Sequence, residues 1–141
     1  MFANFRCRNL RSAGVVLCCL GLMSLGCGQR SIHEYVPNDA AARAALTTAL
    51  DAWKSGKAPD KIGASGPAVQ AQDTQWRDGQ KLVDYEIVGP APAVAEDPNR
   101  RYTVKLTLAG AAEPRETIYI VVGKDPVFVF SQTSYQQLSG Q

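Results

Sequence analysis

The spacing of apolar residues changes along the chain, and this change constrains the fold more than any other feature. Leu46, Leu50 and Trp53 recur at the i, i+4, i+7 spacing that places side chains on one face of a helix. Between residues 102 and 108, apolar residues alternate with threonine and lysine, which is the period of a half-buried strand. A chain with both periods in succession predicts a helix packed on a sheet.

The helix is expected over residues 40–54. Asn38 or Asp39 offers the N-cap oxygen, and the alanine-rich sequence that follows has a high helix propensity. Lys54 and Lys57 suit the negative end of the helix dipole, and Gly56 suits the left-handed residue that ends a helix.

Five segments with strand character follow, at residues 69–76, 81–88, 102–108, 115–122 and 127 to 131 or 133. Asp78-Gly79 lies between the first two and supplies the positive φ values of a tight hairpin. Short connections elsewhere imply an antiparallel meander. The predicted fold class is α+β: one N-terminal amphipathic helix packed on a curved antiparallel sheet of four to five strands.

The beginning of the chain has the pattern of an export signal. Arg6, Arg8 and Arg11 are the only charged residues before Cys27, and an apolar stretch over residues 13–25 follows them. This stretch is shorter than the roughly 20 apolar residues that a spanning helix needs. Residues 1–26 are therefore predicted to be a cleavable signal peptide, 27–36 a lipid-anchored tether, 37–135 a small α+β domain and 136–141 a C-terminal tail.

The residues Ser24-Leu25-Gly26-Cys27 resemble a bacterial lipobox, in which an aliphatic residue, a small residue and then Gly or Ala precede an acylated cysteine. Here Ser24 stands in place of the usual leucine and Leu25 in place of a smaller residue, whereas the Gly-Cys pair is kept. The resemblance implies that Cys27 carries lipid and that membrane lipid is a partner of the mature chain. The protein would then be exported and membrane-anchored, facing the periplasm or the cell exterior. An ordinary signal-peptidase site, for which Ser24-Leu25-Gly26 is a valid small-x-small pattern, and an uncleaved anchor are the alternatives.

Cysteine and charge placement agree with export. All four cysteines lie within the first 27 residues, so the domain forms no internal disulfide and depends on its core. Removing the three early arginines from the fifteen basic residues leaves twelve against thirteen acidic residues. A near-neutral domain without a basic stripe argues against nucleic-acid binding.

One helix followed by four or five antiparallel strands resembles the cystatin-like and nuclear-transport-factor-2-like families, in which a curved sheet wraps a helix. The resemblance covers roughly residues 35–135 and rests on element order. The cystatin inhibitory loop Gln-x-Val-x-Gly has a partial counterpart in Tyr119-Ile120-Val121-Val122-Gly123, which has tyrosine in place of glutamine and lies at a different hairpin.

Several chemistries lack the residues they need. His33 is the only histidine and lies in the predicted tether, so neither a zinc site nor a histidine-dependent nucleophile is expected. No catalytic, cofactor-binding or metal-binding residue is predicted. Asp73 or Asp84 keeps an enzyme alternative open, because a carboxylate in a pocket between helix and sheet can act as an acid or base. A filled core would instead favour a binding module.

Two aromatic features are candidates for contact with a partner. Trp76 is a candidate partner-contact residue, with packing beneath the expected hairpin as the alternative interpretation. Phe128 and Phe130 alternate with valines, so the last strand is a candidate for strand addition if it is an edge and is core if it is internal.

The function predicted from sequence is that of a membrane-anchored cell-envelope lipoprotein with a small non-enzymatic interaction or ligand-binding domain. A nuclear-transport-factor-2-like enzyme with an Asp/Tyr acid-base pocket is one alternative. A cystatin-like periplasmic inhibitor is the other. No ligand or protein partner is assigned from the residues.

Overall fold

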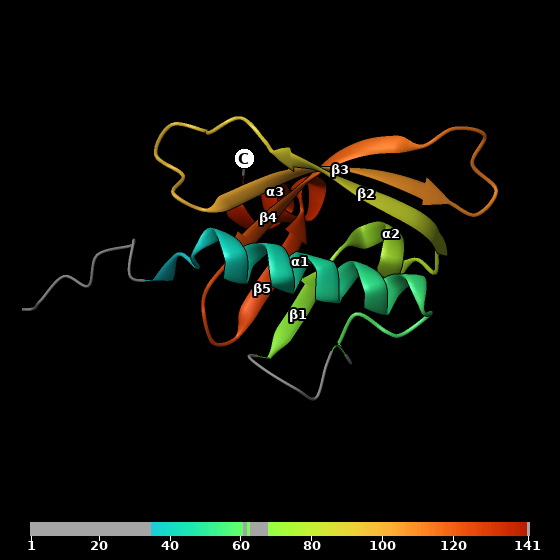
Figure 1. Ribbon diagram of the computed structural model, residues 1–141, viewed down its shortest axis with the longest axis horizontal. Coiled ribbons are helices and arrows are strands. Elements are labelled where there is room, and N and C mark those ends of the chain that lie inside the picture. Colours follow the sequence, from blue (N-terminus) through green and yellow to red (C-terminus); the bar gives the residue numbers. More distant parts are fainter. Residues whose placement is uncertain (1–34, 61, 63–67, 141) are drawn as a thin grey trace, which may run out of the picture.

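The computed structural model describes residues 35–60, 62 and 68–140 (Figure 1). The predicted signal peptide, Cys27, His33 and most of the predicted tether lie outside the described residues. The described helices are α1 (Asp39–Lys54), α2 (Thr74–Arg77) and α3 (Gln132–Ser139). The strands are β1 (Val69–Gln72), β2 (Leu82–Pro90), β3 (Arg100–Leu108), β4 (Arg115–Val122) and β5 (Val127–Ser131).

Helix α1 is confirmed where the apolar spacing predicts it, at residues 39–54 and thus not at the N-terminus of the chain. Asn38 is the N-cap, and its Oδ1 accepts a 2.7 Å hydrogen bond from the Ala41 backbone N–H. The buried face consists of Ala42, Ala45, Leu46, Ala49, Leu50, Ala52 and Trp53. Small residues on this face let the helix lie close to the sheet.

The α+β class is confirmed, but the sheet is mixed, and only β2 to β5 form the predicted antiparallel meander. The strand order is β1-β5-β4-β3-β2, with β1 parallel to β5 and the other pairs antiparallel. The error arises at α2, since the expected first strand stops at Gln72 and Asp73 caps a short helix. Gly79, with φ 85°, ends α2 instead of turning a hairpin. Strands β1 and β2 therefore lie at opposite edges of the sheet.

Two helices cover opposite faces of this twisted sheet (Figure 1). Helix α1 crosses one face, where it packs on alternate strand residues that include Tyr102, Tyr119 and Val129. Helix α3 lies on β4 and β5 at the other face, where Tyr135 meets Phe130 edge to face with ring centroids 5.7 Å apart. Three described helices thus replace the single predicted one, and α3 occupies part of the predicted C-terminal tail.

The last strand is internal to the sheet, which is the core alternative of the sequence analysis. Strand β5 lies between β1 and β4, so the half-buried Phe128 and Phe130 belong to an inner strand that offers no free edge. Strand β2 is an edge of the described sheet, but its ladder shifts register between Leu82 and Asp84 and again between Ile87 and Gly89. Such bulges, together with exposed carboxylates, protect an edge from pairing with another chain.

No described helix has the length and apolar character required to cross a membrane.

Candidate functional site

Tyrosines from three neighbouring strands each donate a hydrogen bond to an aspartate associated with a helix. The pairs are Tyr85 to Asp51 at 2.6 Å, Tyr102 to Asp39 at 2.9 Å and Tyr119 to Asp73 at 2.7 Å. Asp39 and Asp51 lie near the two ends of α1, and Asp73 is the N-cap of α2. These pairs join β2, β3 and β4 to the helices.

The environment keeps these tyrosine hydroxyls protonated. Burial raises the pKa of Tyr119 well above its usual value, and the neighbouring Asp73 carboxylate raises it further. Burial and the hydrogen bond to Asp39 raise the pKa of Tyr102 to about 12. Burial also raises the pKa of Tyr85, with a further contribution from Asp51. Hydroxyls of this kind donate hydrogen bonds and are poor bases near neutral pH.

The two carboxylates that sequence analysis singled out are occupied by structural contacts. Asp73 is only 3% exposed, and its Oδ1 accepts from the Trp76 backbone N–H at 3.1 Å while its Oδ2 accepts from Tyr119. Asp84 lies on the surface, where a hydrogen bond from Lys54 Nζ at 2.8 Å lowers its pKa. Neither residue lines any of the three hollows described below.

Two tryptophans join the C-terminal ends of α1 and α2. The rings of Trp53 and Trp76 stack with centroids 5.5 Å apart and an interplanar angle of 10°. Trp53 Nε1 donates to the Gln80 carbonyl at 2.7 Å, and Trp76 Nε1 donates to the Lys57 carbonyl at 2.9 Å. Each indole N–H therefore binds the carbonyl just beyond the glycine that ends the other helix.

The two helix ends have the same local construction. Gly56 and Gly79 both have positive φ, at 75° and 85°, and each follows its tryptophan by three positions. In both cases the glycine N–H donates to the tryptophan carbonyl and the next N–H donates to the carbonyl five residues before it, as in a Schellman motif. The repeated Trp-x-x-Gly spacing at 53–56 and 76–79 is the sequence signal that could have revealed this pairing.

Trp76 lies in the core, which is the alternative that sequence analysis kept open. It is only 7% exposed, one ring face is covered by Trp53, and its N–H is bound to a carbonyl. The reason for burial differs from the expected one, since Trp76 lies on α2 and not beneath a hairpin. A ring with so little exposed surface favours the packing interpretation over contact with a partner.

A hollow of about 370 Å³ opens beside the tryptophan pair. Its lining combines the two helix ends with the start of β2: Trp53, Gly56, Lys57, Ala58, Pro59, Trp76, Arg77, Gly79, Gln80 and Lys81. Among these described lining residues, three are cationic and none is acidic. We call this hollow the cationic pocket and consider it the candidate functional site of the described domain.

Two further hollows have fewer cations among their described lining residues. One of about 400 Å³ adjoins the cationic pocket through Pro59 and Arg77 and includes Asp60, so its charge is mixed. The other, of about 470 Å³, lies at the N-terminal end of α1 and includes Arg100 and Lys124. Arg100 Nε donates to the neutral Pro37 carbonyl there at 3.2 Å, and neither Arg100 nor Lys124 forms an ion pair with a described residue.

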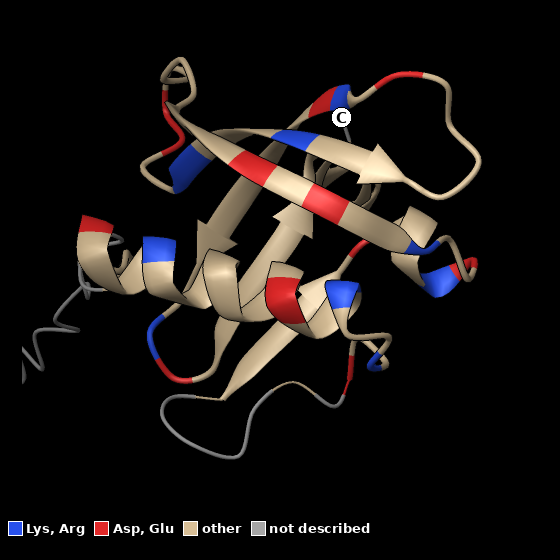
Figure 2. Ribbon diagram, turned by 45° about the vertical axis from the view of Figure 1, so that its right-hand side comes forward, with Lys and Arg blue, Asp and Glu red and all other residues tan. Residues whose placement is uncertain are grey.

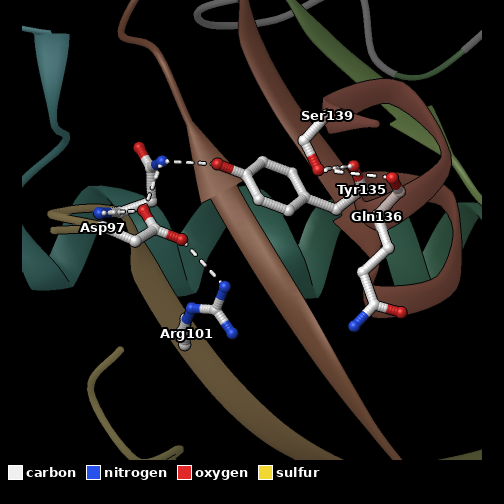
Figure 3. Close-up of polar contacts among 6 residues, drawn as sticks. Asp97, Arg101, Tyr135, Gln136 and Ser139 are labelled. Carbon is white, nitrogen blue, oxygen red and sulfur yellow. Dashed lines mark hydrogen bonds and ion pairs between the residues drawn. The ribbon is translucent and has the colours of Figure 1, made fainter. Parts of the chain in front are cut away.

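A separate polar cluster on the α3 face ties residues 97–101 to α3 (Figure 3). Arg101 Nη2 donates to Asp97 Oδ2 at 2.8 Å, and Asn99 Nδ2 donates to both Asp97 Oδ1 and the Tyr135 hydroxyl. Burial opposes ionisation of Asp97, but hydrogen bonds from Arg101 and Asn99 outweigh burial and lower its pKa. Each of these side chains is hydrogen-bonded to another in the cluster, so the cluster connects the segment before β3 to α3.

The described residues contain no group of three or more His, Cys, Asp or Glu side chains placed to hold a metal ion. The candidate site therefore rests on the geometry of the cationic pocket. In comparisons with known proteins, no family model, no curated protein and no solved structure matches the chain.

Proposed function

We propose that this chain is an exported lipoprotein of the cell envelope, anchored through Cys27, whose folded domain is a non-enzymatic ligand-binding module. One observation carries the binding assignment. The carboxylates suited to acid-base chemistry hold the fold together, whereas Lys57 and Lys81, which have no ion-pair partner among the described residues, line an open hollow.

The acid-base alternative lacks an accessible pair. Asp73 and Tyr119 lie 2.7 Å apart, as an acid-base dyad would, but they are 3% and 2% exposed. A general base must reach the proton that it removes, directly or through one water. Both oxygens of Asp73 already accept hydrogen bonds from the chain, which favours a structural role for this pair.

The anchoring half of the proposal is supported by the sequence. Tyr35, the first described residue, follows Cys27 by eight positions, and an extended chain of this length spans at most about 28 Å. Acylation at the cysteine thioether and the amino group would supply the two lipid signals that stable anchoring requires. The module would then act close to the bilayer surface.

Intact-mass analysis of the chain from a membrane fraction tests the anchor. We expect a species that begins at Cys27 and carries added acyl mass, and we expect Cys27→Ser to lose this mass and leave the membrane fraction. A wild-type chain that begins with an unmodified Cys27 and washes off with salt would refute the lipoprotein assignment.

A search for turnover tests the binding assignment. A bound ligand should be recovered chemically unchanged after incubation with the protein. Chemical conversion that Asp73→Asn or Asp84→Asn abolishes, in variants with unchanged unfolding midpoints, would show that the module is an enzyme.

A further inference from the structure

The cationic pocket contains positive charge that the described chain does not neutralise. Lys57 and Lys81 form no ion pair with any described residue, and Arg77 donates to the neutral side-chain amide of Gln72. Asp60 lines only the adjoining hollow, and Asp78 lines neither. In Figure 2, blue segments in the loop that follows α1 and around α2 lie on one side of the molecule, with red segments beside them.

Helix dipoles account for only part of this charge. Cations favour helix C-termini, which explains Arg77 in the last turn of α2, but the effect fades within about one turn. Lys81 lies beyond Gly79, just before β2. In addition, the carbonyls beyond the two glycines already accept the indole N–H groups of the tryptophan pair. The dipoles therefore leave Lys81 unexplained.

The backbone around the pocket is held by contacts within the chain. The stacked indoles, their reciprocal hydrogen bonds and the two glycine caps fix the ends of α1 and α2 relative to each other. A preformed site loses little conformational entropy on binding. Its volume of about 370 Å³ is within the usual range for small-molecule sites.

We infer that the cationic pocket binds a small anion with more than one phosphate or carboxylate group, held by Lys57, Arg77 and Lys81. The inference rests on the proposed binding function and names its ligand class. Three cations around one hollow favour a multiply charged ligand over a single carboxylate, because each can donate a charge-assisted hydrogen bond. Asp60 lines the adjoining hollow, where a carboxylate would repel the same ligand.

The two tryptophans of the chain both line this pocket, so intrinsic fluorescence reports on the site directly. The full-length chain in mild detergent would be titrated with inorganic pyrophosphate and, separately, with citrate, and the heats would be followed by calorimetry. We expect saturable binding of at least one probe, weakened by added salt. Removing one cation by Lys57→Gln or Lys81→Gln should weaken binding about tenfold, and the double variant more.

Lys124→Gln is the matched control, because this exposed lysine lines the hollow at the other end of α1. Its affinity should stay within about twofold of wild type. Equal weakening by Lys124→Gln, or a dissociation constant above about 1 mM for both probes by fluorescence and calorimetry, would overturn the inference. Unchanged unfolding midpoints in the variants would show that the pocket itself is intact.

Vesicles separate a soluble anion from a lipid headgroup. Stronger binding to phosphatidylglycerol than to phosphatidylcholine vesicles, without binding to either free probe, would mean surface attraction to an anionic membrane and would also overturn the inference. Failure of the anion-binding inference is distinct from failure of the proposed lipid anchor. The titration does not depend on Cys27, and the acyl mass measured at Cys27 does not depend on the pocket.

Discussion

Replacing Tyr119 with phenylalanine removes one hydroxyl from beside a buried carboxylate. Asp73 is 3% exposed, and its carboxylate accepts two described hydrogen bonds, from the Tyr119 hydroxyl and from the Trp76 backbone N–H. In the Tyr119→Phe variant one carboxylate oxygen loses its donor without gaining access to water. We therefore expect a loss of stability much larger than an exposed tyrosine would give.

The size of the loss follows from the charge of the acceptor. A hydrogen bond to a charged group contributes roughly 1.5–3 kcal/mol, and a buried acceptor left without a partner loses its solvation as well. We expect Tyr119→Phe to lower the free energy of unfolding by about 2–3 kcal/mol near pH 7. For a domain of roughly 100 residues this corresponds to a fall in Tm of about 10 °C or more.

Urea denaturation followed by tryptophan fluorescence measures this change, with Tyr85→Phe as the matched control. The Tyr85 hydroxyl donates to Asp51 at the surface, so its removal should cost less than about 1 kcal/mol. A double-mutant cycle with Asp73→Asn isolates the charge, because asparagine keeps the shape and the capping oxygen. In that background Tyr119→Phe should cost only about 1 kcal/mol.

Two results would refute this reasoning. If Tyr119→Phe cost no more than Tyr85→Phe, the buried carboxylate would not depend on its hydroxyl donor. If Tyr119→Phe cost the same in the wild-type and the Asp73→Asn backgrounds, the loss would come from packing and not from the charge of the acceptor.

Three further predictions concern other parts of the domain. The pKa of Tyr119 and of Tyr102 is raised in the folded chain, to about 12 for Tyr102. Their contribution to stability is therefore complete below about pH 10 and is lost as the pH rises from there through the folded-state pKa. Alkaline denaturation of the wild type and of Tyr102→Phe measures this loss. Gly123→Ala should lower the melting temperature more than Gly110→Ala. Both glycines have φ near 80°, but of the two only Gly123 would place a Cβ 2.7 Å from a carbonyl oxygen, that of Pro126. Trp76→Phe should lower the free energy of unfolding by about 2 kcal/mol, because it removes the indole N–H bond to the Lys57 carbonyl and part of the stacking on Trp53. A variant as stable as wild type would show that the tryptophan pair does not stabilise the contact between the ends of α1 and α2.

The parts of the fold that depend on neighbours in sequence were predictable. Helix α1 follows from an apolar stripe, a capping asparagine and a terminal glycine, all within a few residues of one another. Strands β2 to β5 follow from alternation and short connections in the same way. The exclusion of a histidine-based site also needed only the residue inventory.

The short helix α2 marks the limit of such local reasoning. Its four residues carry too little periodicity to distinguish a helix from a strand, and Asp78-Gly79 suits a hairpin and a helix end equally well. The capping oxygen of Asp73 is a local signal that favours the helix. Its role became clear only with the Trp76 N–H on one oxygen and the Tyr119 hydroxyl on the other.

The sequence by itself determined the type of the longer elements, α1 and β2 to β5, and which side chains are present for chemistry. What only the tertiary structure decided was which distant segments meet: β1 beside β5 as a parallel pair, and Tyr119 on Asp73 across 46 positions. The physical reason is that periodicity and capping act over single turns, whereas these contacts depend on how whole faces bury one another. The cationic pocket belongs to the second kind, since two helix ends from different parts of the chain form it.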